Sequence, residues 1–189
     1  VAYPLAVAVI GRDEAGLKEG ALGSYYGQHH NPEWDAAVWE RMHVHASRAW
    51  SGIFTFLWWS VEPVEGEFDF RKSDAYVKQC REAGMEVLGV LGYPSRWATI
   101  ESPDAIKKTS DLAVRPERWA IRDLAAWKRY VYATVLRYKD QVQHWEIYNE
   151  VNFHPPAAAA TFAGSTADYF ELLKAAYAEA KRANPAARI

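Results

Sequence analysis

The sequence contains a single cysteine, no long run of one charge and no apolar stretch long enough to cross a membrane. Cys80 alone excludes an internal disulfide and a cysteine-rich metal site, and its helix-like surroundings predict a small buried side chain. The formal net charge is -2, without the basic patch that nucleic-acid binding requires. No apolar run approaches the roughly 20 residues of a membrane span. We therefore expect no nucleic-acid or membrane partner, and neither a metal ion nor another cofactor.

Aromatic residues, by contrast, are abundant. The 189 residues include nine Trp, eleven Tyr and seven Phe, and half of all residues are hydrophobic. This is more than a core of this size needs, so we expect some rings to line a surface or groove on which sugars stack, and others to fill the core. The apolar stretch 1–10 lacks a basic lead-in and does not read as a signal peptide, which leaves the localisation open.

Segments typical of strands alternate with segments typical of helices. Strands are predicted over 21–28, 52–60, 86–93 and 141–149. Helices are predicted over 31–49, 71–83 and 117–139, and a last one is capped by Ser165 or Thr166. Residues 187–189 read as the opening of a fifth strand. The segment 94–116 is a long loop, and loops of this length are usually functional.

Alternating strands and helices favour a parallel sheet, which either stays open or closes into a barrel. An open nucleotide-binding sheet has a glycine-rich turn after its first strand, whereas this chain has Gln28-His29-His30-Asn31-Pro32 there. We therefore predict a (β/α)8 TIM barrel. A complete barrel takes ~250 residues. We expect a lead-in over 1–20, and over 21–189 the first four β/α units with the start of strand five.

Candidate functional residues follow from the barrel, because its active site lies at the carboxyl ends of the strands. Asn149-Glu150 is the sharpest candidate. A carboxyl beside an amide, surrounded by aromatic rings, suits proton donation to a glycosidic oxygen. The other candidates at strand ends are potential sugar contacts: His29, His30, Trp59, Tyr93 and Trp97. Glu146 should point into the barrel beneath the site and need a partner there. Glu62, before Pro63, should shape its loop by bonding backbone groups.

The run Trp145-Glu146-Ile147-Tyr148-Asn149-Glu150 resembles the strand-four signature of clan A glycoside hydrolases, and of family 39 in particular. Segments 59–74, 84–98 and 168–185 resemble further clan segments in the same order, so the resemblance covers 21–189. It implies a retaining β-glycosidase in which Glu150 is the proton donor and Asn149 contacts the sugar. The clan's nucleophile ends strand seven, so the resemblance assigns it to no residue of this chain.

Some positions depart from the clan's patterns. Family 10 places three sugar ligands on strand two, where the aligned residues here are Ile53, Phe54 and Leu57, and a histidine after strand three, which is missing. We therefore expect family 39 rather than family 10. Many clan members carry an arginine on strand two, but the run 54–57 contains none, and in this region the chain is more similar to family 42.

Two functions compete at this point. In the first, the full-length protein is a retaining hydrolase of a β-linked oligo- or polysaccharide, and this chain, which holds one catalytic carboxyl, is inactive by itself. In the second, the chain is a non-catalytic carbohydrate-binding half-barrel. In either case the open sheet edges favour self-association.

Overall fold

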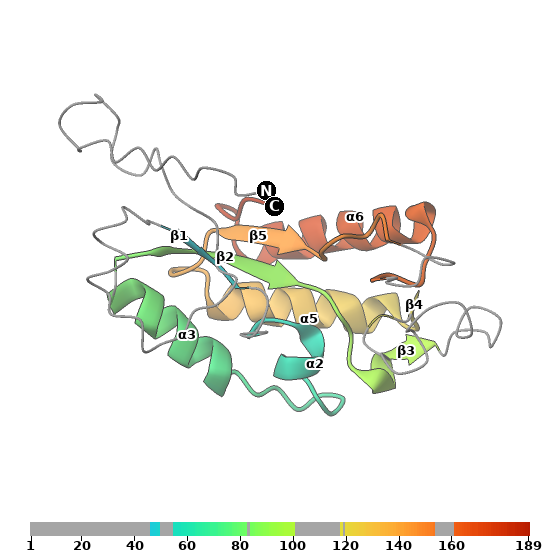
Figure 1. Ribbon diagram of the computed structural model, residues 1–189, viewed down its shortest axis with the longest axis horizontal. Helices are drawn as coiled ribbons and strands as arrows, with labels where there is room; N and C mark the ends of the chain where they lie inside the picture. Colours follow the sequence, from blue (N-terminus) through green and yellow to red (C-terminus); the bar gives the residue numbers. More distant parts are fainter. Residues whose placement is uncertain (1–45, 50–54, 83, 101–117, 119, 154–160) are drawn as a thin grey trace, which may run out of the picture.

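The computed structural model describes residues 46–49, 55–82, 84–100, 118, 120–153 and 161–189 (Figure 1). The strand predicted over 21–28 and most of the helix predicted over 31–49 lie outside these residues. Three parallel strands form the main sheet in the order β1-β2-β5: β1 Ala46–Arg48, β2 Glu86–Leu91 and β5 His144–Ile147. The register pairs Arg48 with Leu88, and Leu91 with Ile147. Neighbouring strands therefore present their carboxyl ends at one edge.

The free side of β5 already carries the start of another strand. Arg188 forms a parallel bridge with His144. Its backbone N–H donates to Gln143 O at 2.7 Å, and its carbonyl accepts from the N–H of Trp145 at 2.8 Å. The predicted opening of a fifth strand is thus confirmed.

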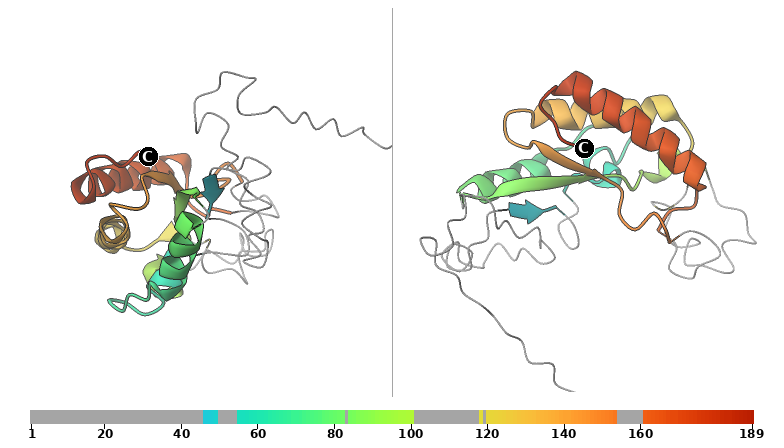
Figure 2. Two further views of the ribbon diagram at one scale, coloured as in Figure 1. Left: turned by 90° about the vertical axis from the view of Figure 1, so that its left-hand side faces the viewer. Right: turned by 90° about the horizontal axis from the view of Figure 1, so that it is seen from above.

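Three long helices lie on one side of this sheet, as the end-on view in Figure 2 shows. They are α3 Arg71–Glu82, α5 Leu124–Arg137 and α6 Thr166–Ala183. The sequence predicts Gly84 as the C-terminal stop of the helix over 71–83. Gly84 follows α3 with φ 68°, a conformation that glycine adopts without strain and that such a stop requires. Ser165 caps α6 in a reciprocal capping box with Asp168. In the described part of the chain, no helix is both long and apolar enough to cross a bilayer.

The remaining elements are short and lie at the carboxyl end of β2. They are α2 Trp58–Val61, the 3-10 turn η1 Arg96–Ala98, and a two-stranded antiparallel ribbon of β3 Thr99–Ile100 and β4 Ala120–Ile121. Aromatic rings fill the space between the sheet and the helices. Trp58 stacks on Tyr130 of α5 with ring centroids 5.1 Å apart, and Phe56 lies edge-on to Trp145 at 5.3 Å. Cys80 is buried in α3, as expected.

Two predicted elements are wrong where the structure describes them. Residues 46–48, predicted to lie in a helix, form strand β1 instead, because they pair with β2. The strand predicted over 52–60 contains the helix α2 instead. The N–H groups of Trp58 and Trp59 donate to the carbonyls of Gly92 and Tyr93, so a long-range contact sets the conformation of this apolar run.

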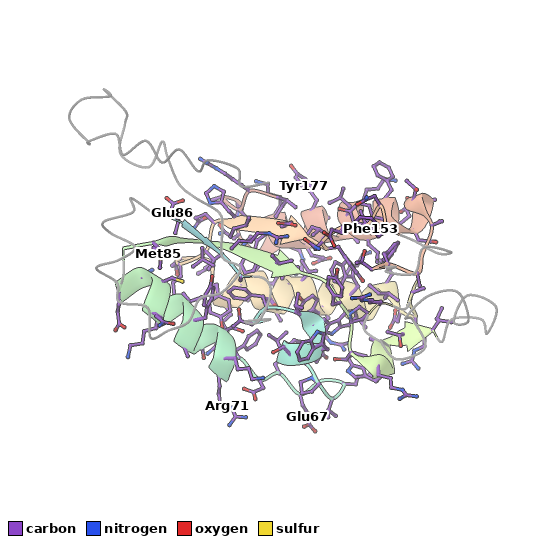
Figure 3. The ribbon with its side chains drawn as sticks, viewed as in Figure 1. Glu67, Arg71, Met85, Glu86, Phe153 and Tyr177 are labelled. Carbon is purple, nitrogen blue, oxygen red and sulfur yellow. The ribbon has the colours of Figure 1, made fainter. Side chains whose placement is uncertain are left out.

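The helix predicted over 117–139 also begins later than expected. Asp123 caps α5 by accepting a hydrogen bond from Ala125 N at 2.8 Å, so Leu124 is the first helical residue. Helical spacing predicts Leu124 on the inner side of this helix, but it is 40% exposed. On α6 the helical spacing of Tyr169, Leu173, Ala176, Tyr177 and Ala180 predicts one inner face. Tyr177, however, is 53% exposed and points away from the molecule (Figure 3). The buried face of α6 instead contains Leu172, Ala175, Ala176, Ala180 and Ala183.

Candidate active site

The carboxyl ends of β2 and β5 bring three of the predicted site residues together. Figure 3 shows Glu86, at the amino end of β2, on the opposite side of the molecule from Phe153, which follows β5. At the Phe153 end, Tyr148 N donates to Leu91 O at 2.7 Å. The Tyr93 hydroxyl donates to the main-chain oxygen of Asn149 at 3.1 Å. Tyr93, Asn149 and Glu150 therefore form one cluster at the carboxyl end of the strands, where barrels of the predicted class carry their active sites.

The backbone of this cluster is strained. Tyr93, Tyr148 and Glu150 have φ angles of 54°, 62° and 52°, and are the positive-φ non-glycine residues in the described part of the chain. A side chain in this left-handed region costs about 1–2 kcal/mol per residue. Such strain persists where the surrounding structure enforces it, and it gathers at active and binding sites. All three strained residues here follow a strand end.

The strain also redirects a side chain. The alternation of a strand predicts that Glu146, Tyr148 and Glu150 share one side. Tyr148 instead turns toward the helices, where its ring lies 6.0 Å from Trp127 and 5.3 Å from Phe162. The strand ends at Ile147, so the left-handed Tyr148 no longer follows its alternation. Gly92 allows this approach, because a Cβ there would lie 3.0 Å from Cγ of Tyr148.

An arginine that the sequence did not indicate completes the cluster. Arg48 of β1 donates to both carboxylate oxygens of Glu146, at 2.8 and 2.6 Å, and to Oδ1 of Asn149 at 2.8 Å. Glu146 therefore has the partner that its expected position demands. The run 54–57, expected to hold the clan's strand-two arginine, has none, whereas Arg48 lies on β1. The sequence did not indicate Arg48 because it lies in the segment predicted as a helix up to Ala49, whereas the strand was predicted over 52–60.

Glu150 itself combines an exposed side chain with a fixed main chain. Its carbonyl oxygen accepts hydrogen bonds from the hydroxyl of Thr161 and from the N–H of Phe153, the latter at 2.9 Å. Both donors belong to the segments that follow β5. The carboxyl is thus exposed on a backbone that is held in place, an arrangement that allows proton transfer to a bound molecule.

Tyr93 is buried, and its hydroxyl is used within the protein. Burial raises the pKa of Tyr93 to about 12, and the positive charge of Arg118 partly opposes the rise. The hydroxyl is therefore neutral near pH 7 and available to donate to Asn149. This contact holds the main chain that carries Asn149 and Glu150. A sugar contact by Tyr93 stays a prediction.

The two tryptophans expected to stack on sugar lie near the carboxyl end of β2. The ring of Trp97 is half-buried, edge-on to Trp58 at 5.6 Å, and its Nε1 donates to the carbonyl of Glu62 at 3.0 Å. Trp59 is half-buried against the core, and its N–H donates to Tyr93 O, which places it beside the end of β2. Sugar stacking by either ring stays a prediction.

Glu62 shapes its loop, as expected. Its fully buried carboxylate accepts from Trp58 Nε1 at 2.7 Å, from Gly66 N at 2.8 Å and from Arg129 at 2.9 Å. His29 and His30 lie outside the described residues. Among the residues that the structure describes, no three His, Cys, Asp or Glu side chains gather as a metal site would require.

Comparison with known proteins assigns the chain to a family. The model of Glycosyl hydrolase family 10 matches residues 55–189. A thermostable celloxylanase from Thermoclostridium stercorarium is 33% identical over 97 residues, which make up 49% of this chain and 25% of that protein. This chain thus spans about a quarter of the length of that relative.

Solved structures show the same fold. A glucosidase from Croceicoccus marinus superposes with a TM-score of 0.55 at 21% identity, covering 81% of this chain and 31% of that one. A family 39 glycoside hydrolase from Bacteroides cellulosilyticus WH2 gives 0.51 at 20% identity, covering 77% and 25%. With the parallel strands and one-sided helices, these likenesses confirm the predicted fold class, that of the (β/α)8 barrel.

The preference for family 39 over family 10 is wrong, because the family match is to family 10. The preference rested on Ile53, Phe54 and Leu57 as strand-two positions and on the missing histidine after strand three. Leu57 is the N-cap of α2, and the strand that pairs with β2 covers Ala46–Arg48 instead. Leu57, at least, therefore does not hold a strand-two position.

Proposed function

Because the chain belongs to glycosyl hydrolase family 10, we propose that the full-length protein is a retaining hydrolase of a β-linked oligo- or polysaccharide, with Glu150 as its proton donor. One observation carries this proposal: Asn149 and Glu150 follow the carboxyl end of β5, where Tyr148 and Glu150 have positive φ angles. Tyr93 and Thr161 bind the main-chain oxygens of Asn149 and Glu150, and Arg48 binds the Asn149 side chain. The name of the matched celloxylanase favours a xylan-like or cellulose-like chain as substrate.

The proposed chemistry needs two carboxyl groups. The Glu150 carboxyl protonates the leaving glycosidic oxygen while a second carboxylate attacks the anomeric carbon from the opposite face. The two groups lie ~5–5.5 Å apart in retaining enzymes. Water then hydrolyses the glycosyl-enzyme, and Glu150, now a carboxylate, takes the proton from that water. Asn149 binds the sugar hydroxyl next to the reacting carbon. The other proposed sugar-binding residues are Trp59, Tyr93, Trp97 and His30.

In this proposal the second carboxylate comes from residues beyond these 189. We therefore expect the 189-residue chain by itself to hydrolyse no glycoside. The alternative function, carbohydrate binding without catalysis, needs a groove but no exposed carboxyl on a strained backbone. The exposed carboxyl of Glu150, just beyond the carboxyl end of β5, accordingly favours catalysis.

The test is the substitution Glu150→Gln in the full-length protein, which removes the acid and keeps the shape. We expect hydrolysis of an unactivated xylo- or cello-oligosaccharide to fall about 10²–10⁴-fold, the usual contribution of general acid catalysis. An aryl glycoside with an activated leaving group should retain much more of its glycosylation rate, because its departure needs little protonation.

The matched control is Glu171→Gln, which replaces an exposed glutamate of α6 that pairs with Lys174 at 2.8 Å. It should hydrolyse both substrates at the parental rate. A Glu150→Gln variant that cleaves the unactivated oligosaccharide at the parental rate contradicts the assignment. Calorimetry with xylo-, gluco- and galacto-oligosaccharides addresses the alternative. Binding by a full-length protein that hydrolyses none of them would favour the non-catalytic function.

A further inference from the structure

Arg48 connects two strands of the sheet that are not neighbours. It lies on β1 and reaches past β2 to Glu146 on β5. Trp145 faces Phe56 on the helix side of the sheet, so Glu146, the next residue, faces the other way, toward the inside of the barrel. The side chains of Arg48 and Glu146 are 18% and 33% exposed. The ion pair is thus part of the lining beneath the site.

The contact between Arg48 and Glu146 is bidentate. Nε and Nη2 each donate to one carboxylate oxygen, at 2.8 and 2.6 Å. A planar guanidinium held at two points has little freedom left, so the direction of its remaining N–H groups is fixed as well. One of these, on Nη2, donates to Oδ1 of Asn149 at 2.8 Å.

This contact settles the orientation of the Asn149 amide. A guanidinium only donates hydrogen bonds, so the amide oxygen must face Arg48 and the NH2 group must point away from it. The main-chain oxygen of Asn149 is held separately by the Tyr93 hydroxyl. Asn149, the residue before Glu150, is therefore fixed through both its side chain and its backbone.

We propose that Arg48 and Glu146 are positioning residues of the site: they hold the Asn149 amide so that its NH2 group donates to the sugar hydroxyl oxygen next to the reacting carbon. This inference rests on the proposed function. The inference also specifies the direction of the hydrogen bond between Asn149 and the sugar: Asn149 is the donor. Glu146 acts through Arg48, and Arg48 acts through Asn149.

The first test is Arg48→Lys in the full-length protein. Lysine keeps the positive charge but has one nitrogen in place of the planar guanidinium. It therefore cannot bond both carboxylate oxygens of Glu146 and Asn149 at the same time. We expect kcat on a 2-hydroxy glycoside to fall about 10²-fold, the effect of a small misplacement near the reacting atoms, with KM little changed. On the matched 2-deoxy glycoside, which lacks the hydroxyl in question, the loss should be much smaller.

Asn149→Asp provides a second test that leaves Arg48 untouched. Aspartate keeps an oxygen facing Arg48 and replaces the NH2 donor by another acceptor. It should reproduce the pattern of Arg48→Lys, with a large loss on the 2-hydroxy glycoside and a small one on the 2-deoxy glycoside. Glu146→Gln should shift kcat in the same direction, because it weakens the two-point contact.

Arg137→Lys is the matched control. Arg137 makes the same kind of bidentate pair, with Asp74 at 2.9 and 2.6 Å, but it links α5 to α3 on the helix side of the sheet. It should leave kcat on both glycosides at the parental value, and thermal unfolding of each variant shows how far it is destabilised.

A pattern of equal losses on the two glycosides, or of none, in Arg48→Lys and Asn149→Asp would overturn the positioning role. If Glu150→Gln nevertheless abolishes cleavage, the proposed function stands without it. If Glu150→Gln keeps the parental rate, the proposed function fails, and the positioning role fails with it.

Discussion

Tyr130 offers a direct measure of how the carboxyl end of the sheet is held. It lies on α5, fully buried, with its ring stacked on Trp58. Its hydroxyl donates to the carbonyl of Phe56 at 2.5 Å and accepts from the N–H of Gly92 at 3.4 Å. Burial raises the pKa of Tyr130 well above its usual value, so the hydroxyl is neutral. It connects α5 to the segment before α2 and to the end of β2.

The substitution Tyr130→Phe removes this one oxygen and keeps the ring. Phe56 O and Gly92 N then lose a buried partner. One unsatisfied buried group costs about 1–3 kcal/mol, and the long contact to Gly92 adds little, so we expect a loss of about 2–3 kcal/mol. At ~2–4 °C per kcal/mol for a domain of this size, the melting temperature should fall by roughly 4–12 °C.

Urea and thermal unfolding, followed by circular dichroism, measure this loss. The control is Tyr177→Phe, which removes the same oxygen from a tyrosine of α6 that is 53% exposed. It should change the unfolding free energy by less than about 0.5 kcal/mol. The reasoning is refuted if the unfolding free energy of Tyr130→Phe lies within about 0.5 kcal/mol of the parent value. The buried hydroxyl would then make no hydrogen bonds that water could not replace.

Two further predictions concern packing and pH. Gly89→Ala places a Cβ 2.4 Å from two ring atoms of the buried Trp145, so overpacking should cost about 1–3 kcal/mol, and an unchanged melting temperature would contradict it. The hydrogen bonds from Arg137 lower the pKa of Asp74, with a further hydrogen bond from Tyr138 acting in the same direction. This stabilisation is fully present above the unfolded pKa of about 4 and is lost as the pH falls through the lower folded pKa. Since both side chains are over 40% exposed, Asp74→Asn should lower stability by at most about 1 kcal/mol at pH 7 and by less near pH 2, and a loss that is independent of pH would exclude this cause.

The helices that the sequence predicts well are those whose ends carry local signals. Ser165 and Asp168 cap the start of α6, and Gly84, with its positive φ, follows the end of α3. Both signals are readable in the sequence because helix caps and glycine stops depend on nearby residues alone. The buried strand β2 and the stub at Arg188 also follow from pattern, since a short apolar run after a helix is typical of a parallel strand.

Strand β1 and helix α2 could not be predicted in this way. β1 has three residues and follows a segment with helical periodicity, so only its pairing with β2 makes it a strand. The run before Pro63 is rich in aromatic and β-branched residues, which favour strands, but Trp58 and Trp59 bond to the end of β2 and form a helical turn. In both places a long-range contact outweighs local propensity.

The same division holds for the candidate site. The sequence by itself determined that Asn149 and Glu150 follow a strand of an α/β barrel, because alternation, turns and motif order are properties of the chain. Only the tertiary structure decided that Arg48, about a hundred residues earlier, reaches Glu146 and Asn149, and that Tyr93 binds the main-chain oxygen of Asn149. The physical reason is that parallel strands gather their carboxyl ends at one edge, so a side chain's partners there come from other strands.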